Sequence, residues 1–297
     1  MLKTTVNLLK SFYYRFLSNK SKREKHLLSQ YHRAIALPDW GLKICKSPNH
    51  DLANRIDITV IITCFNYSTY IQEALKSVFL ASQYKTEIEV IVIDDASEDK
   101  SNQKIRELIK ESPIPMTLLT PWWNVGVSRA RNLGVMHARG NYIFILDADN
   151  AVYPRALKNL FCRINKLRAD AAFGPIDRIN PDGSFHSVVS HKEFEPDYLF
   201  NYGNYIDAMA LFRKEKLLQI GGYDVSLLKI IGGWEDYSVW LKFANLGYKV
   251  AFSTQKVGFY RIKSGSMVSL ITNEEVIAFR EHISFQYPEF KAFKDLK

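Results

Sequence analysis

The amino-acid sequence predicts an α/β protein with a largely parallel central sheet. Short runs of β-branched residues alternate with segments in which apolar residues recur every three or four positions, and this alternation is typical of parallel strands joined by helices. With 297 residues and 47% hydrophobic content, the chain can bury one large core or two smaller ones. The composition therefore favours a globular protein over a disordered or fibrous one.

The first four elements alternate strand and helix. We expect a buried strand at residues 58–64 (ITVIITC) and a helix over 66–82, with Ser68 as a candidate N-cap. A second buried strand follows at 88–94 (IEVIVID). The charged helix expected at 100–112 ends where two prolines follow.

Three more elements complete this half of the chain. A short strand is expected at 116–120, a helix at 127–140 that ends at Gly140, and a strand at 141–147 (NYIFILD). Farther on, residues 175–205 are crowded with aromatic and acidic residues but show no clear periodicity. His186 and His191 lie in this stretch, and we interpret both as polar loop residues.

The first 43 residues are strongly basic. They carry nine lysines and arginines against two acids, a net charge of +7 out of the +9 of the whole chain. Apolar residues between Leu2 and Leu17 recur at helical spacing, so we expect a basic amphipathic helical extension over residues 1–56. This extension either lies on an anionic membrane surface or packs on its own domain with a solvated basic face, and both interpretations stay open. Nothing else in the chain supports nucleic-acid binding, and we expect none.

Cysteine usage and hydropathy suggest the compartment. Cys45, Cys64 and Cys162 are odd in number and widely spaced, so they predict neither a disulfide framework nor a zinc site. No segment reaches the roughly 18 uninterrupted apolar residues of a membrane-spanning helix, and no signal-peptide pattern opens the chain. We expect a reduced, cytoplasmic protein, and any membrane contact would be peripheral, on the inner face.

Polar segments follow three of the predicted strands. These segments are TCFNYS after the first strand, DDASED after the second and DADN after the strand that ends at residue 147. The carboxyl ends of parallel strands meet at one edge, and ligands bind there in open α/β sheets. One acidic strand end would be an ordinary turn or cap, but three predict a binding site. The chain has neither the dinucleotide-binding glycine motif nor a P-loop, so any phosphate must be held another way.

Asp147 and Asp149 are separated only by Ala148 at the end of an apolar strand. Two like charges at a buried strand end repel each other and lose hydration. A shared divalent cation would relieve both penalties and bridge to phosphate oxygens, and carboxylates suit Mg²⁺ or Mn²⁺ better than zinc. We expect a turn at Ala148 that lets one carboxylate face the metal and the other a sugar hydroxyl.

Four segments together resemble the family 2 glycosyltransferases, which have the GT-A fold, over about residues 57–270. In chain order they read TVIITCFNYSTYIQEALKSV, VIVIDDASED, NVGVSRARNLGVMHARGNYIFILDADN and GGWEDYSVWLKFANLGYKVAF. The resemblance implies an inverting enzyme that moves a sugar from a nucleotide-diphosphate sugar to an acceptor hydroxyl. It also implies a nucleotide-binding half at 57–150 and an acceptor half at 151–270. Residues 271–297, beyond the resemblance, are expected to form a C-terminal helical segment.

The resemblance assigns part of the chain to the nucleotide-sugar site: Thr63, Phe65, Asn66, Asp94, Asp95, Arg129, Asp147, Ala148 and Asp149. Among these, Asp147 is expected to hold the ribose and Asp149 the metal. Arg129 lies in the first turn of its predicted helix, where a guanidinium and a helix N-terminus both favour anions. We expect Arg131, two positions on, to form surface ion pairs on a solvated helix face.

The acceptor hydroxyl needs a base, and the resemblance assigns this role to Asp236. Glu235 is then expected to orient the acceptor or the base, and Trp234 to stack on a sugar ring. Simple capping of the helix that starts here is the alternative for both acids. In the segment YRIKSGSMVS, Lys263 replaces a histidine that is frequent in the family, so we expect Lys263 and Arg261 to contact the donor diphosphate, and a third protein ligand to the metal is in doubt.

The predicted donor is a nucleotide-diphosphate sugar, with uracil as the default base, and the predicted acceptor is a saccharide or a lipid-linked glycan. Polysaccharide or glycolipid biosynthesis is the expected setting. Two alternatives remain: a catalytically silent protein that binds nucleotide sugars, and a nucleotidyltransferase, which normally carries a glycine-rich phosphate loop that this chain lacks.

Overall fold

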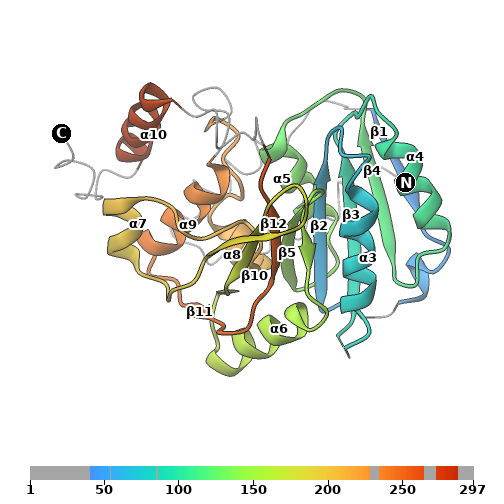
Figure 1. Ribbon diagram of the computed structural model, residues 1–297, viewed down its shortest axis with the longest axis horizontal. Helices are drawn as coiled ribbons and strands as arrows, with labels where there is room; N and C mark the ends of the chain where they lie inside the picture. The colour runs from blue at the N-terminus through green and yellow to red at the C-terminus, as the bar shows by residue number, and fades with distance from the viewer. Residues whose placement is uncertain (1–40, 54, 85, 228–233, 264–271, 287–297) are drawn as a thin grey trace, which may run out of the picture.

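An eight-stranded sheet forms the centre of the computed structural model, which describes residues 41–53, 55–84, 86–227, 234–263 and 272–286 (Figure 1). Its strand order is β1-β4-β3-β2-β5-β10-β7-β11. The four strands β4, β3, β2 and β5 are parallel, whereas β1 and β10 run antiparallel to their neighbours. The strands span β1 Leu42–Lys46, β2 Ile58–Cys64, β3 Ile88–Asp94, β4 Met116–Pro121, β5 Tyr142–Asp147, β7 Ala171–Phe173, β10 Leu211–Arg213 and β11 Val250–Phe252. The predicted α/β class with a largely parallel sheet is confirmed.

A smaller four-stranded sheet has the order β6-β12-β8-β9. Its strands span β6 Ala151–Val152, β8 Ile176–Ile179, β9 Phe185–Val189 and β12 Gly258–Arg261. Strand β6 begins four residues after β5 ends. The turn between them, residues 147–150, carries Asp147 and Asp149 and is called the acidic turn below; it joins the two sheets. The segment that carries Arg261 returns to this turn through the antiparallel pairing of β12 with β6.

Helices cover both faces of the large sheet. Helices α3, α4 and α6 bury their apolar sides in one core, and α5 and α7–α10 contribute to the core on the other face. Helices α7, α9 and α10 lie at the end of the molecule opposite β1 and α4 (Figure 1). The helices span η1 His50–Leu52, α3 Ile71–Ala81, α4 Ser101–Lys110, α5 Val127–His137, α6 Ala156–Leu167, α7 Pro196–Tyr202, α8 Lys214–Gln219, α9 Glu235–Asn245 and α10 Asn273–Gln286. No helix in the described ranges is long and apolar enough to cross a membrane.

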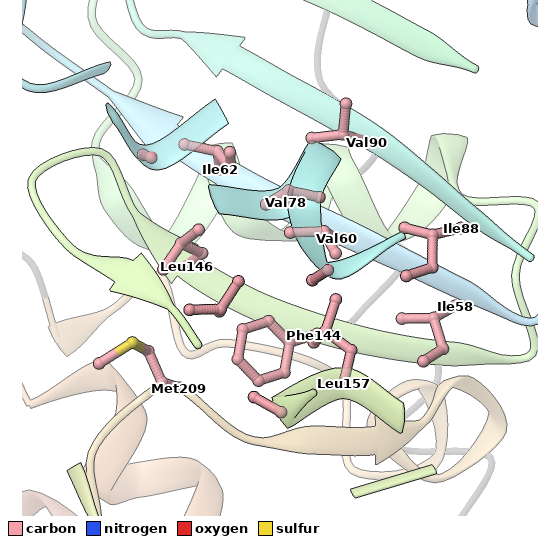
Figure 2. Packing of buried hydrophobic residues seen from close by; sticks show 14 of the residues in the cluster. Ile58, Val60, Ile62, Val78, Ile88, Val90, Phe144, Leu146, Leu157 and Met209 are labelled. Atoms are coloured by element: carbon pink, nitrogen blue, oxygen red, sulfur yellow. The ribbon is translucent and has the colours of Figure 1, made fainter. Parts of the chain in front are cut away.

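Strand β2 packs its side chains into both cores. Ile58, Val60 and Ile62 point to the core under α3, where Phe144 of β5 and Leu157 of α6 meet them (Figure 2). The intervening Ile61 belongs to the opposite core. Each such side chain contributes about 1.5–3 kcal/mol through burial. A one-residue shift in register would exchange the two sets, so the register and the level at which the strands end are fixed.

Two expectations about the N-terminal part of the domain are wrong. Residues 42–46, placed in a helical extension, form β1, because the helical periodicity stops near Leu17 and the open edge of β4 offers a pairing partner. Helix α3 begins at Ile71, so Tyr70 and not Ser68 occupies the N-cap position. Ser68 lies in the preceding turn, where its backbone N–H donates to Asp99 Oδ2 at 2.9 Å. Residues 1–40 of the expected extension lie outside the described residues.

Candidate active site

The parallel strands end level with one another, so their polar segments share one edge. Thr63 of β2 pairs with Asp147 of β5, and Cys64 pairs with Asp94 of β3. Thr63 is half-buried, and the Phe65 ring beyond it is 43% exposed at this edge. The three strand ends therefore meet at one edge of the sheet, as predicted.

Asn66 ties the loop after β2 to the loop after β3. It adopts a left-handed backbone conformation with φ 61°, which asparagine tolerates better than most residues. Its Oδ1 accepts hydrogen bonds from the backbone N–H groups of Glu98 at 2.9 Å and Asp99 at 3.3 Å. The two loops that border the edge are thus held together by a residue expected in the nucleotide cleft.

The adjacent acids Asp94 and Asp95 turn to different partners. Asp94 is buried, and its Oδ2 accepts a hydrogen bond from Asn102 Nδ2 at 2.5 Å. Asp95 accepts the backbone N–H groups of Val125 at 2.7 Å and Gly126 at 2.9 Å with its two oxygens. Burial raises the pKa of Asp95 despite these bonds. Asp95 therefore supports the N-terminus of α5, whereas Asp94 is held from the side of α4.

The two arginines of α5 have different surroundings. Arg129 Nη1 lies 3.4 Å from the carbonyl oxygen of Val125, two residues before its helix begins. Arg131, expected on a solvated face, is only 3% exposed. The prediction is wrong because the segment near Tyr223 crosses the outer side of α5: Asn132 exchanges two hydrogen bonds with the Tyr223 backbone, and the Tyr223 ring lies 5.2 Å from the Arg131 guanidinium.

Arg131 joins the two acidic motifs. Its Nη2 donates to Asp147 Oδ1 at 2.8 Å, and its Nη1 donates to Glu235 Oε1 at 2.5 Å. Burial lowers the pKa of Arg131, but Asp147 and Glu235 more than offset this effect and raise the pKa above its ordinary value. The end of β5 and the start of α9, 88 positions apart by number, are therefore fixed against each other at one charged group.

The acids of the DAD segment separate at a turn, as expected. The backbone N–H of Asn150 donates to the carbonyl oxygen of Asp147 at 3.1 Å, and Ala148 is fully buried. Asp147 is thereby directed to Arg131, whereas Asp149 Oδ2 lies 2.6 Å from Lys263 Nζ. Burial and then the charge of Asp147 raise the pKa of Asp149, with Lys263 opposing them.

Arg261 and Lys263 both lie beside the acidic turn. Arg261 Nη2 donates to Glu73 Oε2 of α3 at 2.8 Å, and its backbone N–H donates to Asn150 Oδ1 at 3.0 Å. Lys263 Nζ lies 3.9 Å from the centroid of the Tyr67 ring. Two basic side chains thus lie at the part of the edge where the metal and diphosphate were expected.

The acids at the start of α9 occupy the other side of Arg131. Asp236 Oδ2 accepts a hydrogen bond from Asn204 Nδ2 at 3.1 Å, and Oδ1 accepts the backbone N–H of Tyr237 at 2.8 Å. Burial first, and then the neighbouring Glu235, raise the pKa of Asp236 well above its ordinary value, while Arg131 lowers it. A carboxylate in such an environment is a stronger proton acceptor than one in water.

Trp234 packs against neighbouring aromatic side chains. The centroid of its ring lies 5.1 Å from that of Phe279 in α10 and 6.0 Å from that of Tyr237. The ring is half-buried, so only part of it is left for stacking on a sugar. His186 and His191 are both exposed, but His186 lies in strand β9 and not in a loop as expected. In the described ranges His186 Nδ1 contacts Ser187 Oγ at 2.9 Å rather than any acid of the site.

Asp207 is a further acid of the site that no motif marked. It lies four positions before β10, which runs antiparallel to β5, so it stands near the carboxyl end of β5. Its Oδ1 accepts the backbone N–H of Met209 at 2.9 Å. Burial, reinforced by the charge of Asp147, raises the pKa of Asp207 to about 6. A single acid in an aperiodic, aromatic-rich loop gives no sequence signal.

The acidic turn carries carboxylates, which are the ligands that a hard cation prefers, but it offers only a few of them. Among the described residues, no group of three or more histidines, cysteines or acids is arranged to hold a metal ion. Mg²⁺ and Mn²⁺ sites in enzymes often use one or two carboxylates and complete their coordination with substrate phosphates and water. Asp149 fits a site of that kind, provided that the donor supplies the remaining oxygens.

Comparison with known proteins gives the family of this chain. The glycosyl transferase family 2 model matches residues 59–221. The chain is 27% identical over 232 residues to glycosyltransferase GlyA of Streptococcus pneumoniae, covering 73% of this chain and 32% of GlyA. It is 29% identical over 160 residues to the succinoglycan biosynthesis protein ExoO of Rhizobium meliloti, covering 54% and 44% of the two chains. It therefore spans less than half the length of either relative.

Solved structures share the architecture. S. aureus TarS in complex with UDP-GlcNAc superposes with a TM-score of 0.61 at 19% identity, covering 82% of this chain and 68% of TarS. The mannosyltransferase PcManGT from Pyrobaculum calidifontis, in complex with GDP-Man and Mn²⁺, superposes with a TM-score of 0.57 at 18% identity, covering 100% of this chain and 77% of that one. At such identities the likeness concerns the fold. The family match and the fold agree with the sequence motifs, and the chain belongs to glycosyl transferase family 2, with the GT-A fold.

Proposed function

We propose that the protein transfers a sugar from a nucleotide-diphosphate sugar to an acceptor hydroxyl, with inversion at the anomeric carbon. The observation that carries this proposal is the bridge through Arg131, which fixes the DAD turn and the Glu235–Asp236 pair on opposite sides of one buried charge. A donor held at Asp147 and Asp149 would then have the base candidate Asp236 across from its departing diphosphate. This is the arrangement that a single displacement needs.

In this proposal Asp236 takes the proton of the acceptor hydroxyl as the acceptor oxygen attacks the anomeric carbon. The bond between that carbon and the diphosphate breaks, and the nucleoside diphosphate leaves with the bonding electrons. The raised pKa of Asp236 supports this role, because a base is most useful when its pKa approaches the working pH. Asn204 and Glu235 would orient the carboxylate and the acceptor.

The nucleotide side of the proposal follows the remaining predicted residues. Thr63, Phe65, Asn66, Asp94 and Arg129 would border the nucleotide, and Asp147 the ribose. UDP is the proposed nucleotide, and the UDP-GlcNAc complex of TarS supports a donor of this type.

We further propose that Asp149 holds Mn²⁺ or Mg²⁺ when the donor is bound, and the Mn²⁺ complex of PcManGT supports this assignment. Such a cation would neutralise charge that develops on the diphosphate. Arg261 and Lys263 would add positive charge from the protein at the same place.

The proposed acceptor is a saccharide or a lipid-linked glycan, in polysaccharide or glycolipid biosynthesis. The likeness to ExoO, named for succinoglycan biosynthesis, supports this setting. The net positive charge of the first 43 residues supports a peripheral location on an anionic membrane.

One experiment tests donor, nucleotide and metal together. The melting temperature of the full chain is measured with UDP-glucose, UDP-galactose, UDP-GlcNAc, UDP-GalNAc and GDP-mannose, each with and without Mn²⁺. A donor that binds raises the melting temperature. Hydrolysis of that donor, or transfer from it, then separates an enzyme from a protein that only binds it. If no sugar nucleotide raises the melting temperature, the proposal is wrong.

A further inference from the structure

The acidic turn after β5 already holds a positive charge that belongs to the chain. The ammonium of Lys263 lies 2.6 Å from Asp149 Oδ2, and the exposed fractions of the two side chains are 23% and 12%. The same ammonium lies 3.9 Å from the Tyr67 ring centroid and 4.9 Å from that of Tyr70. An ion pair in this setting is screened less than one at the surface, and the two rings favour a cation.

The ammonium and a divalent cation compete for Asp149. The oxygen that contacts Lys263 is one of the two that a metal would use, and an ammonium a few ångströms from a divalent ion repels it. Of the other positive groups at the edge, Arg131 is buried between two carboxylates, and Arg261 is paired with Glu73. Lys263 is attached by a flexible four-carbon stem and is only partly buried, so it can move at lower cost.

We propose that Lys263 and the metal exchange at Asp149. In the donor-free protein the ammonium holds the carboxylate and keeps the affinity for the metal low. When a donor binds, its diphosphate receives the ammonium and Asp149 receives the metal. The charges balance, because the two ionised phosphate groups together with Asp149 match a divalent metal and one ammonium. The second half of this inference rests on the proposed function, whereas the low metal affinity of the donor-free protein does not.

The test is a titration of the purified full chain with Mn²⁺ alone, in which free Mn²⁺ is followed by its electron paramagnetic resonance signal. The titration is repeated in the presence of UDP and of GDP, and the Mn²⁺ that each nucleotide binds on its own is measured without protein and subtracted. Lys263→Met removes the charge and keeps the length of the side chain. Lys256→Met is the matched control, because Lys256 Nζ lies 2.8 Å from Asp177 Oδ1 and 5.8 Å from the Phe185 ring centroid, outside the acidic turn.

Without nucleotide, we expect Lys263→Met to bind Mn²⁺ at least about tenfold more tightly than the wild type, and Lys256→Met to bind it like the wild type. With nucleotide, we expect the Mn²⁺ affinity of the wild type to rise by a larger factor than that of Lys263→Met, because the variant has no ammonium to displace.

Equal Mn²⁺ affinity of the wild type and Lys263→Met without nucleotide would overturn the exchange. So would wild-type Mn²⁺ affinity that is as high without nucleotide as with it, a result that needs no variant and therefore no assumption about its folding. If Lys263→Met gains Mn²⁺ affinity but neither nucleotide binds the wild type, the competition at Asp149 stands and the proposed function fails.

Discussion

Replacing Arg131 with methionine tests whether the buried bridge holds the two acidic motifs together. Methionine has a similar length but no charge, so Glu235 would keep its buried position without its cation. The Glu235 side chain is only 7% exposed, so water cannot replace its lost partner. The Asp147 side chain is 30% exposed, so hydration replaces part of the stabilisation that Arg131 gave it. Removing one partner of a buried ion pair costs about 3–5 kcal/mol. We expect a loss near the lower end, about 3–4 kcal/mol in the free energy of unfolding.

Thermal unfolding measures this loss directly. For a domain of this size, about 3–4 kcal/mol corresponds to a fall in melting temperature of roughly 6–16 °C. The double variant Arg131→Met with Glu235→Gln removes the stranded charge, so we expect it to be at least about 1 kcal/mol more stable than Arg131→Met alone. Both variants should also lose transfer activity, because Asp147 and Asp236 are no longer fixed against each other.

Arg139→Met is the control. Arg139 Nε lies 2.6 Å from Glu89 Oε2, and the Glu89 side chain is 2% exposed, so the buried acid is comparable to Glu235. Glu89 Oε1, however, keeps hydrogen bonds from Thr59 Oγ1 and from the backbone N–H of residue 139, both at 2.7 Å. We expect a loss of only about 1–2 kcal/mol. The reasoning is refuted if Arg131→Met melts within about 2 °C of the wild type, or if Arg139→Met loses as much stability as Arg131→Met.

Three further predictions concern single carboxylates. Asp236→Asn should reduce turnover by about 10²–10⁴ and leave the donor-induced rise in melting temperature unchanged. In the wild type, burial raises the pKa of Asp236, so activity should fall as the pH drops through a midpoint well above 3.8, and a midpoint at 3.8 would contradict this role. Burial raises the pKa of Asp207 to about 6, so its ionisation opposes folding above the unfolded-state pKa. Asp207→Asn should therefore melt at a higher temperature than the wild type at pH 7.5 but not at pH 4, and the same difference at both pH values would count against this prediction. Asp95→Ala leaves two backbone N–H groups at the start of α5 without their acceptor and should cost about 2 kcal/mol in thermal unfolding. Asp95→Asn keeps one acceptor oxygen and should cost less; equal losses would contradict the view that these hydrogen bonds supply the stabilisation.

Much of the fold could be predicted because its signals are local. The apolar runs that form β2, β3 and β5 predict buried strands, and the periodic apolar residues between them predict helices. Because parallel strands bring their carboxyl ends to one edge, the sequence also predicts that the three polar segments meet. Strand β1 was missed, because an edge strand that packs on one side only has a weak pattern, and LKICK has lysines at its second and last positions.

The parts of the site that could not be predicted depend on distant contacts. Arg131 has the sequence context of an exposed helical residue, and only the segment around Tyr223, some 90 positions later, makes it a buried one. Asp207 gains its environment from Asp147 of β5 and Arg131 of α5, which no local pattern connects to its loop. Whether Trp234 meets a sugar depends on how much of its ring α10 leaves uncovered. In each case the sequence gives the position of the residue but does not predict which distant residues contact it.

The bridge through Arg131 also limits how this chain can be recombined with its relatives. A chimaera divided near residue 150 would take Arg131 and Asp147 from one parent and Glu235 from the other. Such a hybrid would bury a guanidinium without its second counter-ion unless the second parent also carried an acid at the start of its corresponding helix. Exchange of residues 151–270, the proposed acceptor half, to alter specificity therefore requires that this one charge be matched before any other residue is considered.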